Sequence, residues 1–207
     1  MSTLATTNLK NPDSTINNIV LNTDGSTTVS GAITINNAVT FNGAATFSGA
    51  TNSLRSGAAV VASGTAIDYT SLPSWVKRLT IVFAGVSTNG TNDVLVQVGT
   101  LASGVVSTGY TSTGFTVSTP STFNVSTSTA AFCINTGNAA DVSSGSLTIV
   151  NISGNAWVSN HTLKRSATSA MFGGGDVTLP GTLDRVRVTP DAGDAFDAGA
   201  INIIYEG

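Results

Sequence analysis

The residues after position 57 fall into short apolar runs that are separated by Gly, Asn and Pro. Within these runs apolar and β-branched residues alternate with Ser, Thr or Asn, and no run has the period of an amphipathic helix. Many short strands at roughly ten-residue spacing, with turn residues between them, are typical of a sandwich. We therefore expect an all-β domain without helices, an antiparallel β-sandwich or jelly roll, over 57–207. Its expected strands are 59–62, 66–68, 75–86, 93–98, 109–118, 122–134, 145–151, 155–163, 168–172, 183–189 and 199–205.

Two turn signals in this domain predict hairpins. Asn89-Gly90 is the dipeptide best suited to a two-residue hairpin turn, and it lies between the runs 75–86 and 93–98. The acidic loop 191–197 likewise separates the last two runs of the chain. We expect the two strands on either side of each turn to pair with one another.

Ahead of this domain the sequence repeats in sixes from Ser30 to Ser53, as SGAITI, NNAVTF, NGAATF and SGATNS. A unit this small cannot bury its own apolar face, so such repeats become stable only when neighbours or other copies of the chain cover that face. Three chains wound around one axis would bring together Ile35, Phe41 and Phe47, which end the first three units. We expect a homotrimeric stalk over 30–56; the alternative is a flexible linker.

Residues 1–29 are polar apart from one apolar patch, in which Ile16, Ile19 and Leu21 are prominent. A segment this short does not fold alone, so it is either a tail or a segment that becomes ordered on a partner. We expect it to serve as an anchor, with these three residues as its contacts.

The composition excludes several classes of function. Only 9% of residues are charged, and the eight cations are scattered in pairs at most, so no basic patch is present for nucleic-acid binding. No run approaches the roughly eighteen continuous apolar residues of a membrane span, and we expect no membrane insertion. The first residues carry no charged segment before an apolar core, so no secretory signal is predicted.

Few groups are suited to catalysis or metal binding. Asp191, Asp194 and Asp197 form the only dense acid cluster, but Asp is a common turn former and their spacing does not match a calcium loop. His161 is the only histidine, so one chain cannot form a two-histidine metal site. It is either a polar residue at a strand edge or, contributed by three chains, an ion ligand on a threefold axis. We expect no catalytic site, no metal and no cofactor.

Two blocks of the sequence resemble a known family. They read IDYTSLPSWVKRLTI at 67–81, GVSTNG at 85–90 and VLVQVG at 94–99, then GTLDRVRV at 181–188, FDAG at 196–199 and INIIYE at 201–206. These blocks resemble the C-terminal domain of many phage and prophage tail fibre proteins, over about residues 66–206. The middle, about 105–175, shares only the composition. The stretch 17–26 is similar to the N-terminal segment of short phage fibres.

The resemblance implies a virion structural protein, made in the host cytoplasm and located in the phage tail. In this family residues equivalent to 1–29 would attach to a tail or baseplate protein, and a trimeric β head would adsorb to a glycan or protein of the bacterial surface. Specificity is then expected in the dissimilar middle. The alternatives are a head fibre or capsid decoration protein without a receptor and, less favoured, a polysaccharide depolymerase, which would need two carboxylates at a defined separation.

Several residues of the middle region carry specific expectations. Tyr110 and Phe115 lie among Gly, Ser and Thr and are the candidate receptor contacts. Trp157 lies in a strand pattern and is expected in the core, as is the single cysteine, Cys133. The run 173–175, which is Gly-Gly-Gly, is expected to be a turn.

Overall fold

The computed structural model describes residues 8–9, 19–21, 23, 26–29, 54–120, 122–134 and 137–207. The chain divides into two compact units, Met1–Thr46 and Phe47–Gly207, and each is described by itself. Every regular element among the described residues is a strand, and the strand pairings are antiparallel. The all-β prediction is therefore confirmed for the described part of the chain.

The N-terminal unit contains a small antiparallel sheet in the order β1–β2–β3. Its strands are β1 (Asn8–Leu9), β2 (Ile19–Leu21) and β3 (Thr27–Val29). Ile19, one of the expected anchor residues, pairs with Leu9 on one side and Val29 on the other. Leu21 pairs with Thr27. Part of the segment expected to be a tail or partner-ordered anchor therefore has sheet structure of its own.

The expected anchor residue Ile16 and the expected stalk residues Ile35, Phe41 and Phe47 lie outside the described residues. The trimeric stalk stays a prediction.

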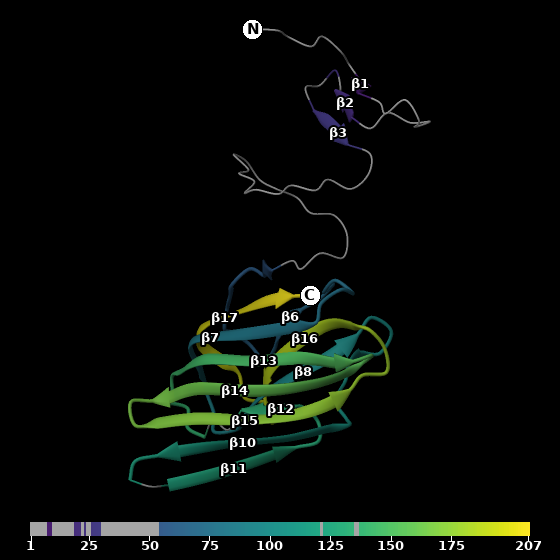
Figure 1. Ribbon diagram of the computed structural model, residues 1–207. Helices are drawn as coiled ribbons and strands as arrows, with labels where there is room; N and C mark the ends of the chain where they lie inside the picture. The colour runs from purple at the N-terminus through teal and green to yellow at the C-terminus, as the bar shows by residue number, and fades with distance from the viewer. Residues whose placement is uncertain are drawn as a thin grey trace. The chain divides into compact units, whose positions relative to one another are not determined.

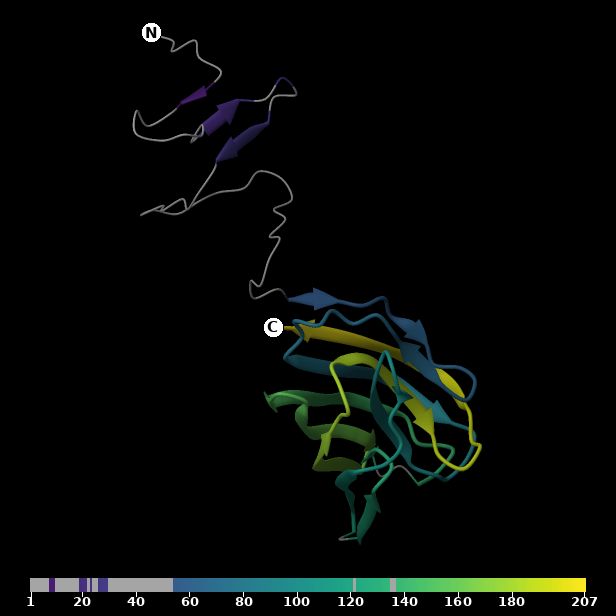
Figure 2. The same ribbon diagram turned by 90° about the vertical axis from the view of Figure 1, so that its right-hand side faces the viewer.

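The second unit is β-sandwich-like, with two antiparallel sheets (Figures 1 and 2). The larger sheet has the order β11-β10-β15-β14-β13-β7-β17-β4, and β5 also pairs with β17. Its strands are β4 (Arg55–Ser56), β5 (Val60–Val61), β7 (Arg78–Thr88), β10 (Tyr110–Ser118), β11 (Thr122–Ser128), β13 (Ser143–Ser153), β14 (Ala156–Ser166), β15 (Ser169–Thr178) and β17 (Phe196–Glu206). The smaller sheet has the order β12-β8-β16-β6, and β9 pairs with β8. Its strands are β6 (Ile67–Tyr69), β8 (Val94–Thr100), β9 (Gly104–Val105), β12 (Phe132–Ile134) and β16 (Leu183–Pro190).

One hydrophobic core includes residues from both sheets. Alternate residues of β7 enter it, and Leu79, Ile81 and Phe83 are almost fully buried, as the alternation predicted. Trp157 and Cys133 are also buried, which confirms the core positions expected for them. Alternation identified these residues because side chains on a strand point to opposite faces in turn.

The two predicted hairpins do not form. β7 and β8 flank Asn89-Gly90, yet β7 pairs with β13 and β17 in the larger sheet while β8 pairs with β12 and β16 in the smaller one. β16 and β17 are divided between the two sheets in the same way. The connections 89–93 and 191–197 therefore cross from one layer to the other. Alternation shows which residues of a strand face the core. It does not show which of the two sheets the strand joins, because both sheets bury an apolar face.

The two crossings lie side by side and hold one another. The Asn89 amide N–H donates to the Ala195 carbonyl at 2.9 Å, and the Ala195 N–H donates to Asn89 Oδ1 at 2.8 Å. The Asp194 carboxylate accepts from the backbone N–H and the side-chain Nδ2 of Asn92 at 2.9 and 3.0 Å.

Three further expectations are corrected. The run 122–134 is two strands, β11 and β12, in different sheets. The run 173–175 lies inside β15 rather than in a turn. Glycine is needed at position 173 for close packing, because a Cβ there would lie 2.3 Å from the Thr113 carbonyl oxygen and 2.6 Å from His161 Cε1. The residues 55–56, expected to end the stalk, form β4 and pair with β17.

A glycine in β17 gives a first test of this fold. Gly199 has φ +92°, and a Cβ there would lie 2.3 Å from the Gly85 carbonyl oxygen. Gly199→Ala is expected to lower the free energy of unfolding by about 2 kcal/mol, since strain and collision add. Gly193→Ala, at φ +88° but with open space around the site, should cost only about 1 kcal/mol. Urea denaturation measures both, and equal losses would contradict the close approach at Gly199.

Candidate functional site

The candidate site lies on the outer face of the larger sheet, at the edge formed by β11. Along β10 the even-numbered residues 110 to 116 face the core, while Phe115 and Val117 face outward. The register places Phe115 between Val125 of β11 and Phe172 of β15, and it places Val117 beside Phe123. We call this group the aromatic patch: Phe115, Val117, Phe123, Val125 and Phe172.

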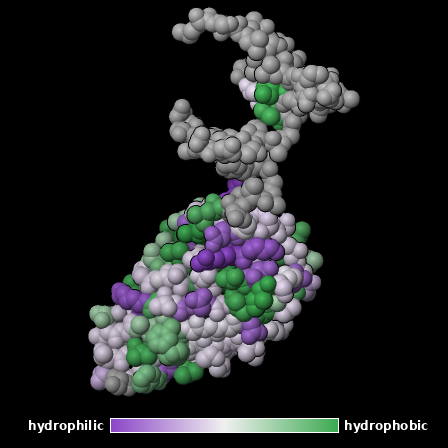
Figure 3. All heavy atoms as spheres, in the orientation of Figure 1, coloured by the Kyte–Doolittle hydropathy of each residue, from purple (hydrophilic) through white to green (hydrophobic). Residues whose placement is uncertain are grey.

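The aromatic patch is apolar and accessible. Phe123 and Val125 are each 66% exposed. Phe115 and Phe172 are half-buried, and their rings pack edge to face with centroids 3.9 Å apart. Apolar side chains gather over this edge of the sheet in Figure 3. Contiguous exposed apolar groups of this kind mark interaction surfaces.

Of the two candidate receptor contacts, Phe115 is therefore accessible on the outer face, but Tyr110 is not. Tyr110 is 2% exposed and packs edge to face against Phe132 in the core. Its hydroxyl accepts from the Val98 N–H at 2.8 Å and donates to the Val106 carbonyl at 3.1 Å. Burial raises the pKa of Tyr110 to about 12. Tyr110 is thus a structural link between β10 and β8.

A shallow groove opens beside the aromatic patch, where β14 turns into β15. We call it the hydroxyl groove. Its apolar lining includes Val117, Ala170 and Phe172, and its polar lining includes Thr162, Lys164, Ser166, Thr168 and Ser169.

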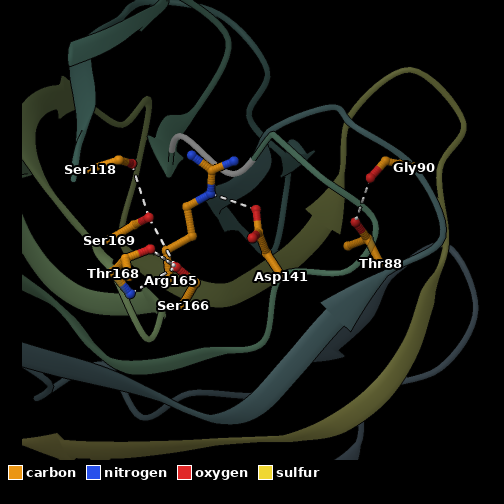
Figure 4. Close-up of polar contacts among 8 residues, drawn as sticks. All are labelled: Thr88, Gly90, Ser118, Asp141, Arg165, Ser166, Thr168 and Ser169. Atoms are coloured by element: carbon orange, nitrogen blue, oxygen red, sulfur yellow. Dashed lines mark hydrogen bonds and ion pairs between the residues drawn. The ribbon is translucent and has the colours of Figure 1, made fainter. Parts of the chain in front are cut away.

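The hydroxyls at this turn form a connected network (Figure 4). Ser118 Oγ and Ser166 Oγ each donate to Ser169 Oγ at 2.9 Å. Ser166 Oγ in turn accepts from the Thr168 backbone N–H at 3.2 Å. Ser118 and Ser169 are adjacent in sequence to the outward-facing Val117 and Ala170, so their hydroxyls point toward the inner face of the sheet.

Next to this turn, on the inner face, Arg165 forms a buried ion pair. Its Nε lies 2.5 Å from Asp141 Oδ2, and the two side chains are only 7% and 13% exposed (Figure 4). Asn138, with its amide oxygen toward Arg165, accepts from Nη2 at 2.8 Å. The pair fixes the segment before β13 to the end of β14.

The carboxylates of the acidic loop 191–197 make hydrogen bonds at the crossings. Asp194 binds Asn92 as described above, Asp197 accepts a hydrogen bond from Ser87 Oγ, and Asp191 Oδ1 accepts from the Ala192 N–H at 2.8 Å. The three carboxylates thus have separate partners. Among the residues that the structure describes, no group of three or more His, Cys, Asp and Glu is arranged to hold a metal ion.

His161 lies inside the sandwich and not at a strand edge, which corrects one of the two readings made from the sequence. It is 3% exposed and belongs to β14, which pairs with β13 and β15 on its two sides. Its Nε2 has no hydrogen-bond partner in the described structure. Burial lowers the pKa of His161 to about 4. The imidazole faces the core rather than a surface where three chains could meet.

No protein-family model, curated protein or solved structure matches this chain. Within the described segments, no helix is long and apolar enough to cross a membrane.

Sequence reasoning selected one of the aromatic residues at the site and missed the other two, Phe123 and Phe172. Phe172 directly follows the apolar Met171 and precedes three glycines, so its local sequence shows no alternation that marks it as outward-facing. Which strands lie beside Phe123 and Phe172 depends on a long-range register that no local pattern reveals.

Proposed function

We propose that the protein is a homotrimeric tail fibre of a phage virion, and that its β-sandwich or jelly-roll head adsorbs to the bacterial host surface through the aromatic patch. The observation that carries this proposal is the patch itself, an exposed aromatic surface on a domain with few charges. The three carboxylates of the loop 191–197, the dense acid cluster of the sequence, have separate hydrogen-bond partners.

The division of the domain into two parts supports this function. The blocks that resemble tail fibres lie together, since β7 pairs with β17 and β16 pairs with both β6 and β8. The aromatic patch is built instead by β10, β11 and β15, which come mostly from the dissimilar middle of the sequence. We expect this division when a framework shared within a family carries a binding surface that differs between its members.

The place of the patch in the sheet also suits adsorption. The chain enters the sandwich at β4, at one edge of the larger sheet, and β11 forms the opposite edge. Seven strand spacings separate them, which is roughly 34 Å at the usual spacing of about 4.8 Å. The aromatic patch thus lies at the edge of the larger sheet opposite the edge where the chain enters the domain.

In this proposal, residues 1–29 attach the fibre to a tail or baseplate protein and residues 30–56 hold three chains together. Three weak sites on each fibre, and several fibres on each particle, then raise the avidity far above that of a single contact.

Mutation of the patch tests the proposed function. Phe115→Ala and Phe172→Ala are each expected to reduce binding of the full chain to host cells by about tenfold or more, because each removes an aromatic contact from the centre of the surface. Binding is measured with fluorescently labelled protein on the cells that the phage infects. Ile152→Ala, at an exposed position of β13 outside the patch, is the matched control and should bind like the parent.

Two outcomes would contradict the proposal. If both phenylalanine variants kept their native mass and bound host cells as the parent does, the patch would have no part in adsorption. Labelling of the protein on the capsid of intact virions would favour the head fibre or decoration alternative.

A further inference from the structure

We infer that the hydroxyl groove binds an anionic sugar residue, a hexose that carries a carboxylate or a phosphate group. The inference rests on the proposed function, because it names the part of a host glycan that this surface would take. Three features of the groove carry it: an apolar wall, a hydroxyl donor and a cation that has no partner among the described residues.

The apolar wall suits the ring of a sugar. Val117 lies opposite Ala170 in the register of β10 and β15, and Phe172 is the next outward residue of β15. The Phe172 ring is held on its other side by Phe115, so it forms a pre-positioned platform. The C–H face of a pyranose can pack on such a platform, with a few polar groups fixing its orientation.

The hydroxyl donor is Thr162 of β14. It lies directly opposite Phe172 in the register and is exposed beside the platform, on the outer face of the sheet. Its hydroxyl can donate to a sugar oxygen or to an acidic group of the ligand.

The cation selects the charge of the ligand. Lys164 is exposed on the outer face and is the register partner of Ala170. It makes no ion pair or hydrogen bond with any described residue. Lys164 and Phe172 are diagonal neighbours, which typically places their Cα atoms about 7–8 Å apart. One sugar residue is large enough to reach both.

No carboxylate on the neighbouring strands neutralises this lysine. Asp176, the acidic residue of β15, lies six residues from Ala170, which is about 20 Å along the strand. Asp141 is nearly buried and pairs with Arg165 on the inner face. The groove is therefore locally positive in a chain of net charge −3, and charge-assisted hydrogen bonds to an anion are favoured there.

Saturation-transfer NMR on the full chain tests the inference with three probes: tetragalacturonate, glucose 6-phosphate and the neutral cellotetraose. We expect the anionic probes to bind with at least tenfold higher affinity than cellotetraose, and added salt to weaken only the anionic probes. Preference between tetragalacturonate and glucose 6-phosphate distinguishes a carboxylated from a phosphorylated sugar. Phe172→Ala should weaken all three probes.

Lys164→Gln is the decisive variant. It is expected to lower the affinity for the anionic probes about tenfold and to leave the affinity for cellotetraose unchanged. Lys77→Gln, which removes another exposed lysine, should leave the affinity for all three probes unchanged. Equal affinity for the charged and neutral probes, absence of binding by any probe, or an unchanged affinity in Lys164→Gln would overturn the inference. Loss of cell binding in the phenylalanine variants would still support the proposed function in that case. If the protein bound tetragalacturonate but did not bind host cells, the inference about the groove would stand and the proposed function in adsorption would be contradicted.

Discussion

Asp141→Ala should lower the free energy of unfolding by about 3–5 kcal/mol, because it leaves the Arg165 charge buried without its carboxylate. Arg165 and Asp141 are 7% and 13% exposed, so water replaces little of the lost interaction. The guanidinium would retain the Asn138 oxygen, which is a weaker partner than a carboxylate. Guanidinium chloride denaturation at neutral pH measures the loss as a lower midpoint at an unchanged slope.

The exposed pair Arg187–Asp68 is the matched control. Arg187 Nε and Nη2 donate to the two Asp68 carboxylate oxygens at 2.8 Å, but the side chains are 38% and 40% exposed. Asp68→Ala should therefore cost less than about 1 kcal/mol. The double variant Asp141→Leu with Arg165→Met removes both buried charges and should recover most of the loss. Equal losses in Asp141→Ala and Asp68→Ala would contradict the role assigned to burial.

Acidification should destabilise the sandwich through His161. The pKa of this group is lowered by burial from its ordinary value of 6.5 to about 4. Between these values the unfolded chain takes up the proton and the folded protein does not, so stability is full above pH 6.5 and declines as the pH falls toward 4. The pKa difference corresponds to a loss of about 3 kcal/mol across this window.

His161→Leu isolates this contribution from the carboxylates, which also titrate in acid. The leucine variant should lose less stability than the parent between pH 6.5 and 4, by about the same 3 kcal/mol, in denaturation curves collected at several pH values. An identical pH dependence of parent and variant would show that the imidazole is not the group responsible.

The sequence predicted the buried faces of the sandwich better than the partners of its strands. Leu79, Ile81 and Phe83 follow from alternation alone, because one strand contains the whole signal. The turn signal at Asn89-Gly90 lies in the connection between β7 and β8. Its strands nevertheless join different sheets, since the choice of sheet depends on packing against strands far away in the sequence.

The candidate site was half predicted, and the error has a local cause. Tyr110 and Phe115 lie on one strand, five residues apart, so they must point to opposite faces of the sheet. Only one of them could face solvent, and the Gly, Ser and Thr residues around both gave no sign of which. The identity of the outward face followed from contacts with Phe172 and Val125, which long-range pairing supplies.

The position of β17 has a consequence for how the domain is made. β17 is the strand furthest along the chain, yet it lies between β7 and the first strands of the sandwich, β4 and β5. During synthesis on the ribosome, β7 keeps an unpaired edge until the residues around 206 have emerged. Folding therefore waits for the whole domain, as long-range sheet pairing generally requires. A product that ends early would expose the open edge of β7 and would be prone to aggregate.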